Sequence, residues 1–136
     1  MKRIFLVLLP VVLIVTLQPG RAAPSDGDSR NMGRISVQEL KSRLGSTDFQ
    51  LMDVRDSISW AFSGTKIPGA VRENPSDVNS WAAKYSKDRV TILYCKHDTT
   101  SASEALQLLE KGFTQVFILK GGWSAWTEAG FPTEKK

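Results

Sequence analysis

The stretch that decides the fold reads Val90-Thr-Ile-Leu-Tyr-Cys95-Lys-His-Asp-Thr-Thr-Ser101-Ala-Ser103-Glu-Ala-Leu-Gln-Leu-Leu-Glu-Lys-Gly112. Residues 90–94 form a short apolar run with β-branched and aromatic members, which predicts a buried strand. Apolar residues then recur at helical spacing from Ala102, which predicts a helix that ends at Gly112. A loop that leaves a strand and enters a helix presents free backbone N–H groups and the positive end of the helix dipole, so it favours an anion.

The only cysteine in the sequence, Cys95, lies in this loop. The thiolate is the reactive form of cysteine, and an anion-binding loop stabilises that form, so Cys95 should ionise more readily than an ordinary thiol. We therefore expect a nucleophile here, and the alternative is a buried, inert cysteine. We expect no metal or other cofactor, because no soft ligand beyond His97 lies near Cys95 in the sequence.

Three further segments accompany the cysteine loop. Asp53-Val54-Arg55 follows an apolar run, and Ile67-Pro68-Gly69-Ala70 is a turn signal, because proline fixes φ and glycine tolerates a positive φ. The carboxy-terminal segment contains Gly112-Phe113, the run Val116-Phe-Ile-Leu-Lys-Gly121-Gly122-Trp123, and then Trp126, Gly130 and Pro132. Together with Cys95-x-x-x-x-Thr100, and in this order, the segments resemble the signatures of rhodanese-like sulfurtransferases from about Ile35 to Pro132.

The resemblance implies an enzyme that moves sulfane sulfur. Cys95 would take sulfur from a small anionic donor such as thiosulfate, become a persulfide, and pass the sulfur to cyanide or a thiol. Backbone N–H groups of the loop would stabilise both the thiolate and the charge that develops during transfer. Those are the partners that we expect, and we expect the protein to act as a monomer.

The residues that follow Cys95 are candidates for substrate binding. Lys96 and His97 can supply positive charge or hydrogen bonds at the mouth of the site, which favours an anionic donor. By resemblance, the Thr100 hydroxyl would point at the sulfur, whereas Ser101 and Ser103 are candidates for capping the helix. The complete set of predicted substrate-binding residues is Lys96, His97, Asp98, Thr99, Thr100, Ser101 and Arg55.

Asp98 departs from the family pattern. Many loops of the family carry glycine at this position, where the backbone can require a positive φ, and aspartate is one of the few other residues that tolerate it. The loop shape can therefore be retained. The negative charge of Asp98, however, opposes an anionic donor.

Asp53 and Arg55 are expected at the carboxyl end of a strand, where open α/β sheets bind ligands. We predict a structural role near the site for Asp53, as an acceptor of hydrogen bonds from loop amides. In some family members the corresponding arginine lies near the catalytic pocket, so Arg55 either attracts the donor or ties neighbouring segments together.

The first 22 residues have the pattern of a secretory signal peptide. Lys2 and Arg3 precede an apolar run of 14 residues, 4–17, which is shorter than the roughly 20 residues that span a bilayer. Small residues up to Ala22 suit cleavage, so we predict a periplasmic or secreted protein without stable membrane insertion. The alternative is an uncleaved segment that anchors the protein in a membrane.

Removing residues 1–22 would lower the formal net charge from +4 to +1, because they hold three basic residues and no acidic one. The basic character of the full chain therefore belongs to the targeting segment. No clustered surplus of lysine and arginine remains to indicate nucleic-acid binding. Residues 23–34 are rich in small and polar residues and are predicted to be a linker, followed by one domain at 35–133.

The remaining pattern predicts alternating helices and strands. Ser36 and Glu39 form a capping-box signature that starts a helix ending at Gly45. Strands are expected at 49–54, 90–94 and 116–119, and a helix at 77–87, with Val78, Trp81, Ala82 and Tyr85 as core residues. Such alternation predicts an α/β fold with a mainly parallel central sheet covered by helices on both faces.

Two other functions are compatible with parts of this pattern. A phosphatase of related fold would need an arginine six positions after the cysteine to bind phosphate in bidentate fashion, and Ser101 occupies that position. A non-catalytic binding or redox-sensing module would keep the fold without the transfer reaction, and an oxidising compartment is consistent with that role.

Overall fold

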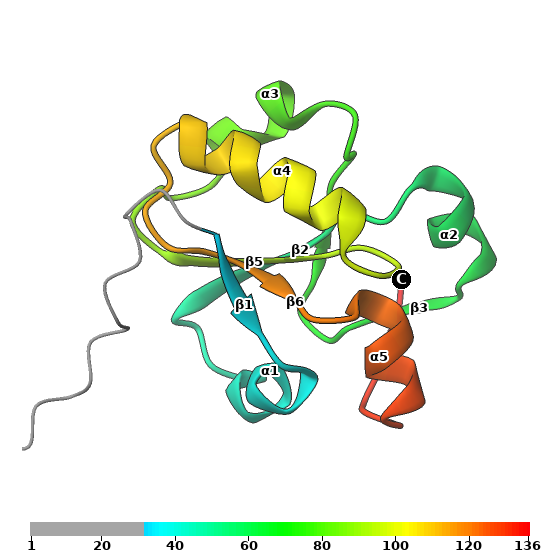
Figure 1. The fold of residues 1–136 in the computed structure, drawn as a ribbon. Coiled ribbons are helices and arrows are strands. Elements are labelled where there is room, and N and C mark those ends of the chain that lie inside the picture. The colour runs from blue at the N-terminus through cyan, green and yellow to red at the C-terminus, as the bar shows by residue number, and fades with distance from the viewer. Residues whose placement is uncertain (1–31) are drawn as a thin grey trace, which may run out of the picture.

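A computed structural model describes residues 32–136. Its central sheet has five strands, all paired in parallel in the order β1-β6-β5-β2-β4 (Figure 1). The strands are β1 (Gly33–Ile35), β2 (Phe49–Asp53), β4 (Val71–Arg72), β5 (Val90–Tyr94) and β6 (Val116–Leu119). A separate antiparallel pair joins β3 (Thr65–Lys66) and β7 (Glu134–Lys135).

Helices cover both faces of the central sheet, so the predicted fold class is confirmed (Figure 1). On one face α1 (Val37–Arg43) and α5 (Gly122–Glu128) pack over a cluster that includes Leu40, Ile92 and Trp126. On the other face α3 (Val78–Trp81), a 3₁₀ turn (Ala82–Lys84) and α4 (Thr99–Glu110) pack over a second buried cluster. The remaining helix, α2 (Ser57–Phe62), contains no buried residue.

The predicted start of α1 is confirmed, whereas the predicted boundaries of the linker and of the helix at 77–87 are wrong. Ser36 and Glu39 form the predicted capping box at the start of α1, with both reciprocal hydrogen bonds present. Gly33 and Arg34, predicted to lie in the linker, instead belong to β1, because they pair with β6. The helix expected over 77–87 is shorter than predicted and ends in the 3₁₀ turn.

The start of α4 also differs from the prediction. The helix begins at Thr99, so Asp98 is its N-cap residue and Ser101 lies inside its first turn. Ser101 and Ser103 therefore do not cap the helix. Asp98 has φ −149°, and among residues 32–136 only glycines have a positive φ. The loop therefore does not require a left-handed backbone conformation at Asp98.

Strand register brings the predicted motifs together at one edge of the sheet. Asp53 at the end of β2 lies opposite Tyr94 at the end of β5, and on its other side opposite Arg72 of β4. Cys95 follows Tyr94 directly. The parallel arrangement thus places the cysteine loop beside the Asp53-Val54-Arg55 segment, at the carboxyl ends of the strands.

The proposed signal peptide lies outside the described residues. Within residues 32–136, no helix combines the length and the apolar character required to cross a membrane.

Helix α4 contains a buried acidic residue, Glu104. The residue is 4% exposed, and its Oε2 atom has no hydrogen-bond partner among the described residues. Burial raises the pKa of the Glu104 carboxyl above its ordinary value, because desolvation disfavours the charged form.

Replacing Glu104 with glutamine is expected to stabilise the protein more near neutral pH than at about pH 4. With a raised folded-state pKa, the folded protein binds the Glu104 proton more tightly than the unfolded chain, so wild-type stability falls as pH rises through the folded-state pKa. Glutamine does not titrate and avoids this loss. Urea unfolding at both pH values measures the effect, with Glu110→Gln on the exposed side of the same helix as control. An equal gain at both pH values would contradict the prediction.

Candidate active site

The thiol of Cys95 lies at the junction of β5 and α4, in contact with Ser101. The backbone N–H of Ser101 donates to Cys95 Sγ at 3.3 Å, and the thiol donates to Ser101 Oγ at 3.5 Å. The Ser101 hydroxyl in turn donates to the backbone oxygen of Asp98 at 3.0 Å. Cys95 is 3% exposed and Ser101 is fully buried, so the contact is shielded from bulk water.

The backbone between these two residues offers unused donors. Within the described part of the chain, the N–H groups of residues 96–100 donate to no protein acceptor. Free N–H groups at the start of a helix are the usual ligands of a bound anion. The loop therefore has the donors that a thiolate, a persulfide or an anionic substrate requires.

Helix α5 holds this loop in place from the opposite side. The N–H of Trp123 donates to Cys95 O at 2.8 Å, and the N–H of Ser124 donates to Lys96 O at 3.0 Å. In a trans peptide the N–H and C=O point in opposite directions, and no described peptide bond is cis. The N–H groups of Lys96 and His97 are consequently directed away from α5.

The contact between loop and helix requires glycine at position 122. Gly122 is buried with φ +56°, a conformation that other residues rarely adopt. A Cβ atom at this position would lie 2.8 Å from the carbonyl carbon of His97, and closer still to the oxygens of Cys95 and His97. The second glycine of the Gly-Gly-Trp motif thus allows α5 to approach the loop backbone.

Asp53 and Arg55 form a buried ion pair, which agrees with the structural role predicted for Asp53. Arg55 Nη2 lies 2.6 Å from Asp53 Oδ2, and Arg55 Nε donates to both carboxylate oxygens at 3.0 Å. The backbone N–H of Arg55 also donates to Asp53 Oδ1 at 3.1 Å. Both side chains have zero exposure.

The alternative role of Arg55, attraction of the donor, does not fit this arrangement. Its guanidinium lies 4.3 Å from the Trp123 ring and 5.1 Å from the Trp60 ring, and Nη2 also donates to Thr65 O at 3.0 Å. The guanidinium is therefore paired with Asp53 and covered by aromatic rings without exposure to solvent, and its Nη1 atom has no hydrogen-bond partner among the described residues. Arg55 instead ties the end of β2 to α2, β3 and α5.

Tyr94, next to the cysteine, completes this network. Its hydroxyl donates to Asp53 Oδ2 at 2.6 Å and accepts from the N–H of Ile67 at 3.2 Å. Burial raises the Tyr94 pKa, and the negative charge of Asp53 raises it further, so the hydroxyl stays protonated. Its ring stacks on Trp123 at a centroid distance of 6.3 Å.

The other predicted site residues occupy different environments. Lys96 and His97 are exposed on the loop, Thr99 is exposed at the first position of α4, and Thr100 is half-buried. The Thr100 hydroxyl forms no hydrogen bond with the cysteine, so the sulfur contact predicted for Thr100 is made by Ser101 instead. Asp98 lies 3.5 Å from the Arg34 guanidinium, with both side chains about half exposed.

Sequence reasoning missed the roles of Gly122 and Tyr94, and it included Ser101 among the substrate-binding residues but assigned the sulfur contact to Thr100. The signal for Gly122 was present as a pair of glycines where α5 begins: Gly121 is the N-cap residue and Gly122 the first helical residue, a position where glycine is disfavoured. Ser101 was assigned to capping because the helix was expected to start later. Nothing in the sequence pattern indicates the contact between Tyr94 and Asp53, which depends on strand register.

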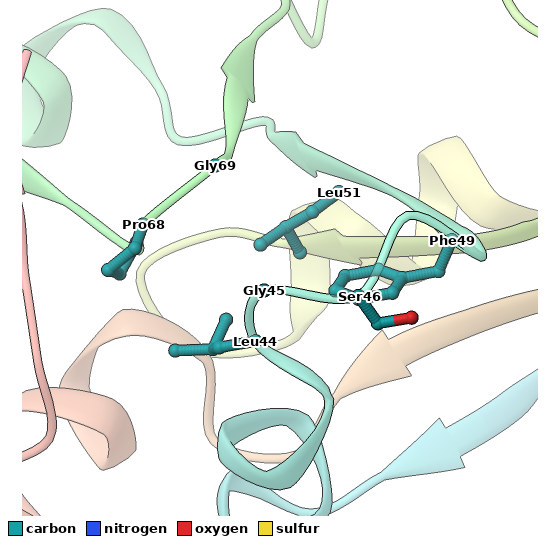
Figure 2. Close-up of a pocket in the computed structure, with 7 residues that line it drawn as sticks. All are labelled: Leu44, Gly45, Ser46, Phe49, Leu51, Pro68 and Gly69. Carbon is teal, nitrogen blue, oxygen red and sulfur yellow. The ribbon is translucent and has the colours of Figure 1, made fainter.

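Two of the pockets in the described residues have volumes of about 290 and 300 Å³. A pocket of about 290 Å³ lies between α2 and the cysteine loop and is lined by Ile58, Ser59, Phe62, Ser63, Lys96 and Trp123. We call it the α2–α5 pocket. The other, of about 300 Å³, is lined by Leu44, Gly45, Ser46, Phe49, Leu51, Pro68 and Gly69 (Figure 2). It includes the amino end of β2 and contains no residue of the cysteine loop.

Comparison with known proteins identifies the family. The model of the rhodanese-like domain matches residues 36–129. The chain belongs to the rhodanese-like family. It is 34% identical to thiosulfate sulfurtransferase GlpE of Shewanella oneidensis over 95 residues, covering 70% of this chain and 92% of the relative. The GlpE protein of Glaesserella parasuis is 29% identical over 100 residues, which is 74% of this chain and 91% of that protein.

Solved structures support the same family assignment. The crystal structure of the Alr3790 protein from Anabaena sp. is 31% identical, with a TM-score of 0.66, and the match covers 75% of this chain and 82% of that one. The resemblance to rhodanese-like proteins predicted from four sequence motifs is thereby confirmed.

Gly122→Ala is expected to lower the free energy of unfolding by about 2 kcal/mol more than Gly130→Ala does. Both glycines have a positive φ, but a Cβ at Gly130 would meet nothing within 4 Å, so this control carries the backbone strain without the clash. Urea denaturation of both variants measures the difference. Equal losses would show that α5 does not press on the cysteine loop.

Proposed function

We propose that this rhodanese-like protein is a sulfurtransferase in which Cys95 carries sulfane sulfur from a donor such as thiosulfate to cyanide or a thiol. The observation that carries the proposal is the contact of Cys95 Sγ with the Ser101 N–H, in a loop whose N–H groups at residues 96–100 donate to no acceptor among the described residues. The thiosulfate sulfurtransferase relatives support the same activity.

In the first step the Cys95 thiolate attacks the outer sulfur of thiosulfate. A bond forms between Cys95 Sγ and that sulfur, the S–S bond of thiosulfate breaks, and sulfite leaves with the bonding electron pair. The Ser101 N–H holds the thiolate before attack. The Ser101 hydroxyl, which accepts from the neutral thiol, can rotate to donate to the thiolate.

In the second step the acceptor attacks the terminal sulfur of the Cys95 persulfide. The Cys95–sulfur bond breaks and its electron pair returns to Sγ, so the thiolate is regenerated and no net oxidant is needed. The free N–H groups of residues 96–100 can hold the negative charge of the terminal sulfur between the two steps. Lys96 and His97, both exposed at this loop, are placed to attract the anionic donor.

We also propose that the protein is exported and acts as a monomer in the periplasm or outside the cell. The proposal is based on Lys2 and Arg3, the apolar run 4–17 and the small residues before Ala23. An uncleaved segment that anchors the protein in a membrane is the alternative.

Incubation of the protein with thiosulfate is expected to add one sulfur atom to the wild type and none to Cys95→Ser, with release of sulfite. Intact mass and sulfite assay follow the reaction. Ser101→Ala keeps the backbone N–H and loses only the hydroxyl, so it should retain uptake with a rate reduced by no more than about tenfold. No uptake from thiosulfate, polysulfide or an organic persulfide would refute the transferase and favour the binding module.

Export predicts that the secreted or periplasmic protein begins at Ala23. Expression of the full chain in a bacterial host, followed by cell fractionation and intact mass, tests this. A full-length species in the membrane fraction would support the anchor, and a full-length soluble species would contradict both forms of the proposal.

A further inference from the structure

Helix α2 directs two of its large apolar side chains, Ile58 and Phe62, outward. Ile58 is 69% exposed and Phe62 is 89% exposed, and they are two of the four exposed large apolar side chains in the described residues. They are four residues apart and therefore lie on the same face of the helix. Both line the α2–α5 pocket. The outward face of α2 is thus a wall of that pocket, and it contributes nothing to the core.

The α2–α5 pocket borders the catalytic loop. Two of its lining residues are Lys96, which follows Cys95, and Trp123, whose backbone N–H donates to the Cys95 oxygen. In Figure 1 the loop after β5 lies between α2 and the start of α5, as these contacts require. A molecule in the pocket therefore lies beside the loop that begins with the sulfur-carrying cysteine.

The walls of the pocket are fixed by buried contacts. The Trp123 ring lies over the Arg55 guanidinium and stacks on Tyr94, so its position is set by the Asp53–Arg55 pair. Trp60, on the opposite face of α2, lies against the same guanidinium. The Trp123 wall is therefore fixed by the buried pair, and Trp60 ties α2, which carries the other wall, to the same guanidinium.

Apolar walls would stabilise neither bound thiosulfate nor bound cyanide. Thiosulfate is a dianion that requires N–H groups and cations, and cyanide is too small to contact Ile58, Phe62 and Trp123 together. A pocket lined by three apolar side chains, two serines and one lysine suits a larger molecule with an apolar body and an anionic end. A thiolate attached to an apolar group has this chemistry.

We infer that the α2–α5 pocket binds the apolar body of an organic thiol, and that this thiol is the acceptor of sulfur from Cys95. The inference rests on the proposed transferase function. The thiolate of the bound acceptor attacks the terminal persulfide sulfur, a new S–S bond forms on the acceptor, and the bond to Cys95 Sγ breaks. The products are an organic persulfide and the Cys95 thiolate, so atoms and electrons balance.

The test compares acceptors that differ in their apolar body. With thiosulfate as donor, kcat/KM is measured for 2-phenylethanethiol, 2-mercaptoethanol and cyanide. The kcat/KM for 2-phenylethanethiol is expected to be about tenfold higher than that for 2-mercaptoethanol, when both are calculated for the concentration of the thiolate form. The reason is that burial of a phenyl group is favourable. Equal values for the two thiols would overturn the inference.

Variants of the pocket separate binding from general damage. Phe62→Ser and Ile58→Ser should each lower kcat/KM for 2-phenylethanethiol by about fivefold and leave the value for cyanide within about twofold of wild type. Leu106→Ser is the matched control, since Leu106 is 52% exposed on α4 and outside the pocket. It should change neither value. Thermal unfolding of each variant checks that the fold is retained.

The outcomes distinguish this inference from the proposed function. Normal transfer to cyanide with no effect of the pocket variants on the phenyl thiol overturns the inference alone. The inference is also overturned if the Ile58 and Phe62 variants lose transfer to cyanide and transfer to the phenyl thiol to the same extent. In that case the two side chains would support the catalytic loop and would not bind the acceptor. Failure of Cys95 to take up sulfur from any donor overturns the function and the inference together.

Discussion

The chemistry of this protein depends on the packing of α5 against the backbone of the cysteine loop. The Trp123 and Ser124 N–H groups donate to the carbonyl oxygens of Cys95 and Lys96, and the N–H groups of the same two peptides have no acceptor among residues 32–136. A seven-residue helix is too short to be stable on its own, so its position is set by tertiary contacts such as Trp126 in the core and Gly122 at the loop. The loop and the helix therefore stabilise each other. This mutual dependence explains why two glycines can begin a helix at a cost in propensity.

The buried Asp53–Arg55 pair contributes to geometry more than to stability. Removing two charges from water costs several kcal/mol per ion, and mutual attraction only roughly offsets that cost. The pair nevertheless makes contacts with Tyr94, Trp60 and Trp123, which belong to β5, α2 and α5. Because these three elements surround the cysteine loop, one charged centre sets the positions of the parts of the site. Apolar residues of the same size would pack but would not fix the rings and the hydroxyl in defined directions.

The sequence was informative where a structural feature depends on neighbours in the chain. The strand before Cys95, the capping box at Ser36 and the alternation of helices and strands follow from local periodicity. Helix α2 was not predicted, because Ile58 and Phe62 face outward and leave no apolar stripe toward the core. The exchange of Ser101 for Thr100 at the sulfur has a geometric reason: successive residues of a helix are about 100° apart, so the exact start of α4 decides which one faces Cys95. The close approach at Gly122 involves residues 25 or more positions away and has no local signal beyond the glycine pair.

Asp98 raised the question of whether an anionic donor can bind next to a carboxylate. The carboxylate is about half exposed and lies 3.5 Å from Arg34, so water and a cation both reduce its field. Two unit charges about 4 Å apart interact by only about 1 kcal/mol in water, and less at greater distance. Each hydrogen bond from a loop N–H to a charged group contributes about 1.5–3 kcal/mol, and the loop has several such donors free. The short-range contacts therefore outweigh the repulsion, and Asp98 is compatible with an anionic sulfur donor at Cys95.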